Sequence, residues 1–275
     1  MSHLTALLSR PARRLALVLA LLVVLAAPAC AAASGSQTGQ RAQVKPTIVL
    51  VHGAWADASG WDVVMGQLQR DGYTVLAVAN PLRDLPGDSA YLASVLHSIT
   101  GPIVLVGHSY GGAVITNAAL GNPQVKALVY VAAFAPDAGE SLTTIEMMNP
   151  GSEIGPTTLV LRPFPGGVDA YISPASFHSA FCADVPAALA AEMGASQRPI
   201  SAAALAEPSG PPAWRTIPSW YLVATEDHAI PPVTERFMAK RMEAHTVEVA
   251  SSHAALVARP GAVTNLILDA VHHTS

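Results

Sequence analysis

The chain has 275 residues, of which 51% are hydrophobic and only 12% charged, so it can bury one large core or two small ones. The formal net charge is −4 at pH 7. The first 30 residues carry three arginines and no acids, so the net charge without them is −7. An acidic chain of this kind argues against a nucleic-acid partner.

The first 30 residues predict an export signal. Three arginines precede the apolar run 15–27, and small residues follow it up to Cys30. A basic start, an apolar centre and a small-residue cleavage site are typical of a signal peptide. The run is shorter than the roughly 20 residues that a membrane-spanning helix needs, which makes a retained anchor the weaker alternative. We expect cleavage after Ala29 or lipidation of Cys30. The mature protein is then extracytoplasmic (secreted, periplasmic or lipid-anchored) and has no membrane span.

The rest of the chain predicts a flexible spacer followed by one α/β domain. Residues 31–45 are rich in Gly, Ser, Gln and Thr, as flexible linkers are. In residues 46–275, apolar runs alternate with stretches of helical spacing, which is typical of a mostly parallel sheet covered by helices on both faces. The predicted strands are 47–51, 73–79, 102–106, 125–132, 219–224 and 246–249, and the predicted helices include 61–70, 89–99 and 112–120.

The first predicted strand ends in the turn His-Gly-Ala-Trp at residues 52–55. Gly53 gives the backbone freedom to turn there. We expect the N–H of Ala54 to point toward the nucleophile described next, as one donor of an oxyanion hole. His52 precedes that nucleophile in the chain, so we expect it to hold the loop by a hydrogen bond rather than to act as the base.

Residues 107–111 read Gly-His-Ser-Tyr-Gly and lie between an apolar run and a helical stretch. A G-x-S-x-G turn in this position is typical of a nucleophile elbow, in which small neighbours let a strained serine stand clear of the sheet. Ser109 is therefore the predicted nucleophile, and the N–H of Tyr110 is the predicted second oxyanion donor. The alternative is a plain glycine-rich turn.

A serine hydroxyl becomes a nucleophile only when a base removes its proton, and the base needs an orienting carboxylate. Asp227 follows the predicted strand 219–224, and His253 lies in the loop after 246–249. The order Ser, Asp, His and the positions at strand ends favour a catalytic triad over a helix-start aspartate and an ordinary loop histidine. Asp137 is the alternative acid, but its Pro-Asp-Ala-Gly setting indicates a turn at the entry to the next segment.

Residues 137–215 lack the strand pattern of the rest of the domain. Pro, Gly, Ser and Ala are frequent, and the apolar spacing favours short helices over sheet. A connection of this length is unusual inside a compact domain, so we expect it to be a lid over the carboxyl ends of the strands. Its Met, Phe and Tyr side chains either line an apolar pocket or form the lid's own small core.

Together these motifs resemble the α/β-hydrolase superfamily and, within it, the plant methylesterase and hydroxynitrile lyase group. The matching segments are 51–55, 107–112, 225–227 with 230–231, and 252–253. The resemblance runs from about residue 45 to the end. It implies an α/β-hydrolase fold with a helical lid inserted after the strand that follows the nucleophile helix. The lyases of this group carry a lysine directly after the catalytic histidine, whereas this chain has Ala254, which disfavours lyase chemistry.

We therefore expect a serine esterase that cleaves carboxylic esters of small to medium apolar substrates through Ser109, Asp227 and His253, with an acyl-enzyme intermediate. No metal ion or organic cofactor is expected, and the sequence does not indicate an oligomeric state. A receptor-like protein with slow turnover is the alternative from a different class. Lactonase, thioesterase, perhydrolase and hydroxynitrile lyase activities are alternatives that use the same site.

Overall fold

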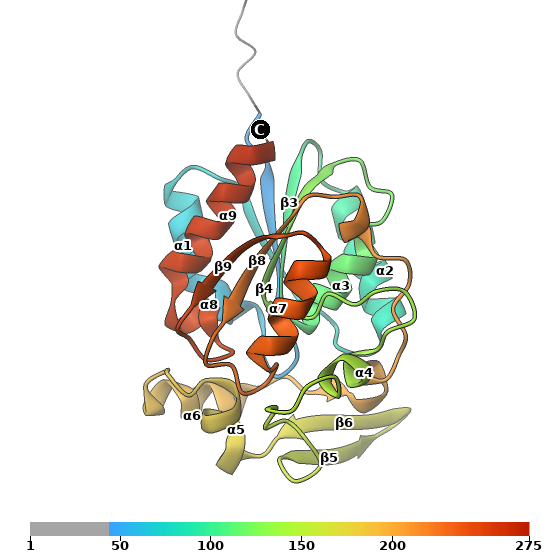
Figure 1. Ribbon diagram of the computed structural model, residues 1–275, viewed down its shortest axis with the longest axis vertical. Helices are drawn as coiled ribbons and strands as arrows, with labels where there is room; N and C mark the ends of the chain where they lie inside the picture. Colours follow the sequence, from blue (N-terminus) through green and yellow to red (C-terminus); the bar gives the residue numbers. More distant parts are fainter. Residues whose placement is uncertain (1–43, 275) are drawn as a thin grey trace, which may run out of the picture. The chain divides into compact units, whose positions relative to one another are not determined.

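The computed structural model describes residues 44–274 and contains a six-stranded parallel sheet with helices on both faces (Figure 1). All neighbouring strands in this sheet are parallel. Their order across the sheet is β2 (Val75–Val78), β1 (Thr47–Val51), β3 (Ile103–Ser109), β4 (Val125–Ala133), β8 (Ser219–Ala224) and β9 (His245–Val249). The predicted strands are thus present with small shifts at their ends, and the predicted α/β-hydrolase class is confirmed.

Alternate residues of each strand enter opposite cores, because successive side chains of a strand point to opposite faces. In β1, for example, Val49 and Val51 belong to one core, and Ile48 and Leu50 to the other. The first core is covered by α2 (Leu85–His97), α3 (Tyr110–Ala118) and α7 (Pro232–Arg241). The second is covered by η1 (Ala58–Trp61), α1 (Asp62–Arg70), α8 (Ala255–Ala258) and α9 (Pro260–Thr274). Burial on both faces explains why these strands are almost continuously apolar in sequence.

The segment between β4 and β8, residues 137–215, is here called the insertion, and it corrects one prediction. It was expected to contain short helices rather than sheet, but it also forms a three-stranded antiparallel sheet. Its helices are α4 (Leu142–Glu146), α5 (Pro174–Phe181), α6 (Ala187–Ser196), η2 (Ala202–Leu205) and η3 (Ala213–Arg215). Its strands are β5 (Leu159–Phe164), β6 (Gly167–Ile172) and β7 (Ile200–Ser201).

The prediction for the insertion failed because these strands lack the long apolar run that marks a strand buried on both faces. No residue of β5 is fully buried, and its apolar run Leu-Val-Leu ends after three residues at Arg162 and Pro163. Proline inside a run argues against a strand. A usable signal was present in the turn between β5 and β6, where Gly166 has φ +104. A Pro-Gly pair at 165–166 is a typical turn sequence, and glycine adopts this backbone conformation without steric cost.

The loop after β1 is fastened to the insertion by Trp55. The Trp55 indole N–H donates to Ala170 O at 2.9 Å, and its backbone N–H donates to Arg198 O at 2.9 Å. In Figure 1 the insertion, drawn largely in yellow, lies at one end of the sheet. The turn that follows the first strand is therefore held between the sheet and the insertion.

The predicted signal peptide, 1–30, and nearly all of the predicted spacer, 31–45, lie outside the described residues, so both stay predictions. Cys30 belongs to this part of the chain. No helix within residues 44–274 combines the length and the apolar character needed to cross a membrane.

Candidate active site

Ser109 ends β3, and α3 begins at the next residue. The backbone at Ser109 has φ 53 and ψ −125, a conformation that residues with a side chain rarely adopt. The neighbouring glycines make this turn sterically feasible. A Cβ atom on Gly111 would lie 2.5 Å from Val51 O, and one on Gly112 would collide with Phe134 O. The turn has the geometry of a nucleophile elbow.

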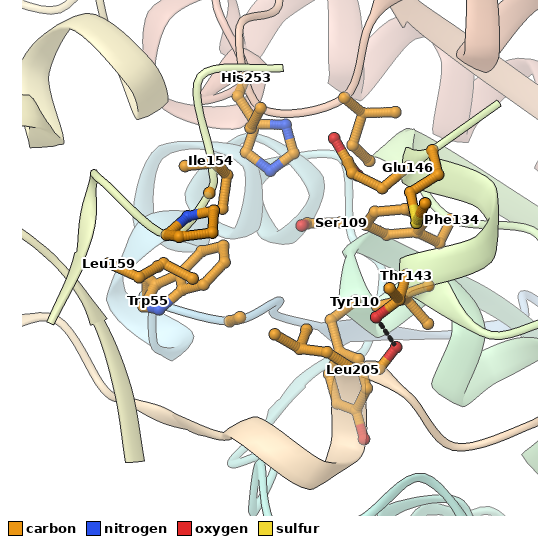
Figure 2. Close-up of a pocket in the computed structure, with 17 residues that line it drawn as sticks. Trp55, Ser109, Tyr110, Phe134, Thr143, Glu146, Ile154, Leu159, Leu205 and His253 are labelled. Atoms are coloured by element: carbon orange, nitrogen blue, oxygen red, sulfur yellow. Dashed lines mark hydrogen bonds between the residues drawn. The ribbon is translucent and has the colours of Figure 1, made fainter. Parts of the chain in front are cut away.

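Ser109 lies at the wall of a cavity of about 380 Å³ (Figure 2). The cavity is largely apolar, and the insertion supplies about half of its wall. From the sheet side it is lined by Ala54, Trp55, Ser109, Tyr110, Phe134, Ala229, Ile230 and His253. From the insertion it is lined by Leu142, Thr143, Glu146, Met147, Ile154, Gly155, Pro156, Leu159 and Leu205.

His253 and Asp227 form a buried pair beside this cavity. His253 Nδ1 lies 2.6 Å from Asp227 Oδ2, and both side chains are almost fully buried. The other carboxylate oxygen, Oδ1, accepts hydrogen bonds from the N–H groups of Ala229 at 2.6 Å and Ile230 at 2.8 Å. Because an ionised carboxylate only accepts hydrogen bonds, Nδ1 carries the proton of the neutral imidazole. The lone pair is then on Nε2.

His253 Nε2 is buried and has no hydrogen-bond partner among the described residues, Ser109 included. His253 and Ser109 nevertheless line the same cavity, and in Figure 2 the imidazole lies above the Ser109 side chain. Catalytic hydrogen bonds are often long in a free enzyme and shorten when substrate binds. The unpaired nitrogen thus belongs to a residue that shares the cavity wall with Ser109.

Three further side chains hold the His253–Asp227 pair in place. His108 Nε2 donates to the backbone oxygen of His253 at 3.0 Å, and Phe181 packs its ring against the imidazole with centroids 5.0 Å apart. Glu235 lies beside Asp227 and accepts the N–H of Ala224 at 3.0 Å. Burial and the charge of Asp227 raise the pKa of Glu235 well above its usual range, so it remains neutral and does not repel the aspartate.

The loop after β1 lies directly against the elbow. A Cβ atom on Gly53 would be 2.5 Å from Ser109 Cβ, so only glycine allows this approach. His52 fixes the loop through both ring nitrogens: Nδ1 donates to Gly53 O at 2.9 Å, and Nε2 accepts the N–H of Asn80 at 3.0 Å. This is the loop-holding contact that the sequence predicted. It brings Ala54 to the cavity wall beside Ser109.

The side chain of Tyr110 is held in place by Asp88. Its hydroxyl donates to Asp88 Oδ2 at 2.8 Å, and Asp88 also accepts the backbone N–H of Arg83. Since Tyr110 is the first residue of α3, its own N–H belongs to the first turn and has no partner within the helix. The Asp88 contact thus fixes the residue whose N–H is the predicted second oxyanion donor.

The alternative acid, Asp137, has a different partner. Its carboxylate forms a hydrogen-bonded ion pair with Arg215 at 2.5 Å at the edge of the insertion. His253 pairs with Asp227 instead. Among residues 44–274 there is no group of three or more His, Cys, Asp or Glu side chains that could hold a metal ion.

Four buried or cavity-lining side chains at the site were not predicted: Asp88, His108, Glu146 and Glu235. His108 lies inside the G-x-S-x-G motif, but nothing in that motif indicates a contact with residue 253. The other three are single acidic residues in helical segments, where an exposed carboxylate is the ordinary expectation. Only an acid in the middle of an apolar helical face could have been a signal. Glu146, directly after Ile145 and before Met147, comes closest.

The chain belongs to the alpha/beta hydrolase family, whose model matches residues 48–266. A relative named carbendazim hydrolyzing esterase, from Nocardioides sp. (strain SG-4G), is 34% identical over 110 residues. That match covers 35% of this chain and 46% of the esterase. The alpha/beta hydrolase nvfD of Aspergillus novofumigatus (strain IBT 16806) is 27% identical over 82% of this chain and 97% of its own length.

Solved structures show the same fold. Polyneuridine aldehyde esterase matches with a TM-score of 0.69 and 22% identity, over 82% of this chain and 99% of its own. A pyrethroid hydrolase from Sphingobium faniae JZ-2 matches with a TM-score of 0.67 and 23% identity, over 82% and 97%. The family match and the names of the sequence relatives support the predicted esterase-type α/β-hydrolase.

Proposed function

We propose that this protein hydrolyses carboxylic esters of small to medium apolar substrates through an acyl-enzyme on Ser109. The observation that carries the proposal is the buried His253–Asp227 pair: its Nε2 has no partner among the described residues, and His253 lines the same cavity as the strained Ser109. The apolar wall and the volume of about 380 Å³ favour a compact substrate with little charge. The insertion then acts as the lid that shapes this cavity.

In the proposed mechanism, His253 Nε2 removes the proton of Ser109 as Oγ attacks the ester carbonyl carbon. Asp227 keeps the proton on Nδ1 and stabilises the imidazolium that forms. The N–H groups of Ala54 and Tyr110 stabilise the negative charge on the carbonyl oxygen. The imidazolium then protonates the leaving alcohol. Water attacks the acyl-enzyme, with His253 again as the base.

A panel of 4-nitrophenyl esters, from acetate to dodecanoate, tests this activity. We expect steady turnover that is fastest with short or medium acyl chains, because the cavity limits the length of the acyl group. A single burst followed by no further release would instead indicate a receptor-like protein. Faster cleavage of a cyanohydrin than of any ester would restore the lyase alternative.

We also propose that the protein is exported, on the basis of the basic and apolar pattern of residues 1–30. Fractionation of cells that produce the chain with a C-terminal epitope tag is expected to find a shortened product outside the cytoplasm. Its N-terminus should follow Ala29 or be a lipidated Cys30. A variant without residues 1–30 is the control and should stay in the cytoplasm. A full-length cytoplasmic product from the complete chain would contradict the proposal.

A further inference from the structure

The loop that carries His253, residues 250–254, connects β9 to α8 and is held from two sides. On one side the His108 ring donates to the backbone oxygen of His253. On the other side the loop contacts residues 181–184 of the insertion, at the end of α5 and the start of its connection to α6. In Figure 1 these two helices lie below α8, the helix that follows the loop. The insertion therefore touches the loop of the proposed base as well as the cavity.

Asp184 of the insertion binds the residue directly before His253. The Ser252 hydroxyl donates to Asp184 Oδ1, and Ser252 is buried. Asp184 Oδ2 forms an ion pair with Arg259 Nη1 at 3.2 Å, just after the end of α8. The Asp184 carboxylate thus has a partner on each oxygen, which fixes its orientation toward Ser252.

The two residues that follow Ser252 contact the same stretch of the insertion. The N–H of Ala254 donates to Phe181 O at 3.1 Å, and the Phe181 ring packs against the His253 imidazole. A buried hydroxyl without a partner is unfavourable, so loss of the Asp184 carboxylate favours a shift of the loop. Because Ser252 directly precedes His253, a shift of its backbone also moves the imidazole.

We propose that Asp184 is a positioning residue, which holds His253 in the orientation that general-base catalysis requires through the hydroxyl of Ser252. The insertion then both shapes the cavity and fixes the base. Misplacement of a reacting group by about 1 Å can lower a rate by about 100-fold, so a loosened loop affects kcat more than substrate binding. This inference rests on the ester hydrolysis proposed above.

The first test replaces Asp184 in two ways and measures kcat and KM with 4-nitrophenyl butyrate. Asp184→Leu removes both oxygens, and kcat should fall by about 10- to 100-fold with KM within about twofold of the wild type. Asp184→Asn removes the charge that pairs with Arg259 but keeps a hydrogen bond, because a hydroxyl can pair with either end of an amide. Its kcat should stay within about threefold of the wild type. Glu192→Leu, the same substitution on an exposed acid of α6, is the control and should behave as the wild type.

A double-mutant cycle separates positioning from a general effect of the insertion on activity. Ser252→Ala removes the other partner of the same hydrogen bond and should lower kcat by a factor similar to that of Asp184→Leu. The double variant Ser252→Ala/Asp184→Leu should be no slower than the slower single variant, because both substitutions remove one interaction. Multiplied effects in the double variant, or an unchanged kcat in a folded Asp184→Leu, would overturn the proposal.

Hydrogen exchange at the Ala254 amide tests the contact without any turnover. In Asp184→Leu and Ser252→Ala this amide should exchange about 10-fold faster than in the wild type, because the loop opens more often. In Asp184→Asn and Glu192→Leu it should exchange at the wild-type rate. Unchanged exchange in both Asp184→Leu and Ser252→Ala would overturn the proposal.

The two measurements distinguish this proposal from the proposed ester hydrolysis. If the wild type turns over no ester, the hydrolysis proposal fails, and hydrogen exchange still tests whether Asp184 holds the loop. If Asp184→Leu does not fold, Ser252→Ala, which removes a single oxygen atom, supplies both kcat and the exchange rate. Wild-type values of either quantity in Ser252→Ala would then overturn the role of Asp184.

Discussion

Replacement of Ser109 by alanine is expected to lower kcat for ester hydrolysis by about 10⁴-fold or more. The variant lacks the oxygen that attacks the carbonyl, whereas the cavity, His253 and the oxyanion donors remain. The fold should be retained, because alanine meets the same backbone constraint at φ 53 as serine and adds no atoms to the crowded turn. Initial rates with 4-nitrophenyl butyrate and a denaturant unfolding curve measure the two effects.

The control for this substitution is Ser94→Ala, which removes a hydroxyl from an exposed position on α2 and should keep full activity. An organophosphate should label the wild type and Ser94→Ala at a single serine, and it should not label Ser109→Ala. Substantial ester turnover by a folded Ser109→Ala protein would show that another group is the nucleophile.

Asp227→Asn is expected to lower kcat by about 10⁴-fold with little change in the fold. The structure explains the size of this effect. The oxygen at the Oδ1 position accepts two backbone N–H groups, from Ala229 and Ile230, so the amide oxygen of asparagine should stay there. The amide NH₂ group then faces His253 Nδ1 and donates to it. This moves the imidazole proton to Nε2, which can no longer accept the proton of Ser109.

Asp137→Asn provides the matched comparison for this prediction. It removes the same charge from a partly exposed carboxylate that pairs with Arg215, and we expect kcat/KM within about twofold of the wild type. Measurement of both variants at the same pH decides between the two acids. Loss of activity in Asp137→Asn with retention in Asp227→Asn would reassign the acid and contradict the contact between His253 and Asp227.

Much of the fold could be read from the sequence because the central strands are buried on both faces. Runs such as Ile-Val-Leu-Val at 48–51 have no polar position, and this pattern is typical of parallel strands between two helical layers. The segments that carry Ser109, Asp227 and His253 were predicted from strand ends in the same way. Ser109 ends β3, and Asp227 and His253 lie in the loops that follow β8 and β9. The pairing of Asp227 with His253 agrees with that expectation.

The insertion and the finer parts of the site depended on the tertiary structure. The apolar runs of β5 and β6 are no longer than three residues, so their pairing is visible only once the chain is folded. Glu146 reads as an ordinary acid in sequence, and its burial arises because the insertion folds back over the cavity. The sequence alone determined the sheet and the order of the reactive residues, since local burial patterns encode them. Cavity shape and proton placement were decided by contacts between residues far apart in the chain, which no local pattern records.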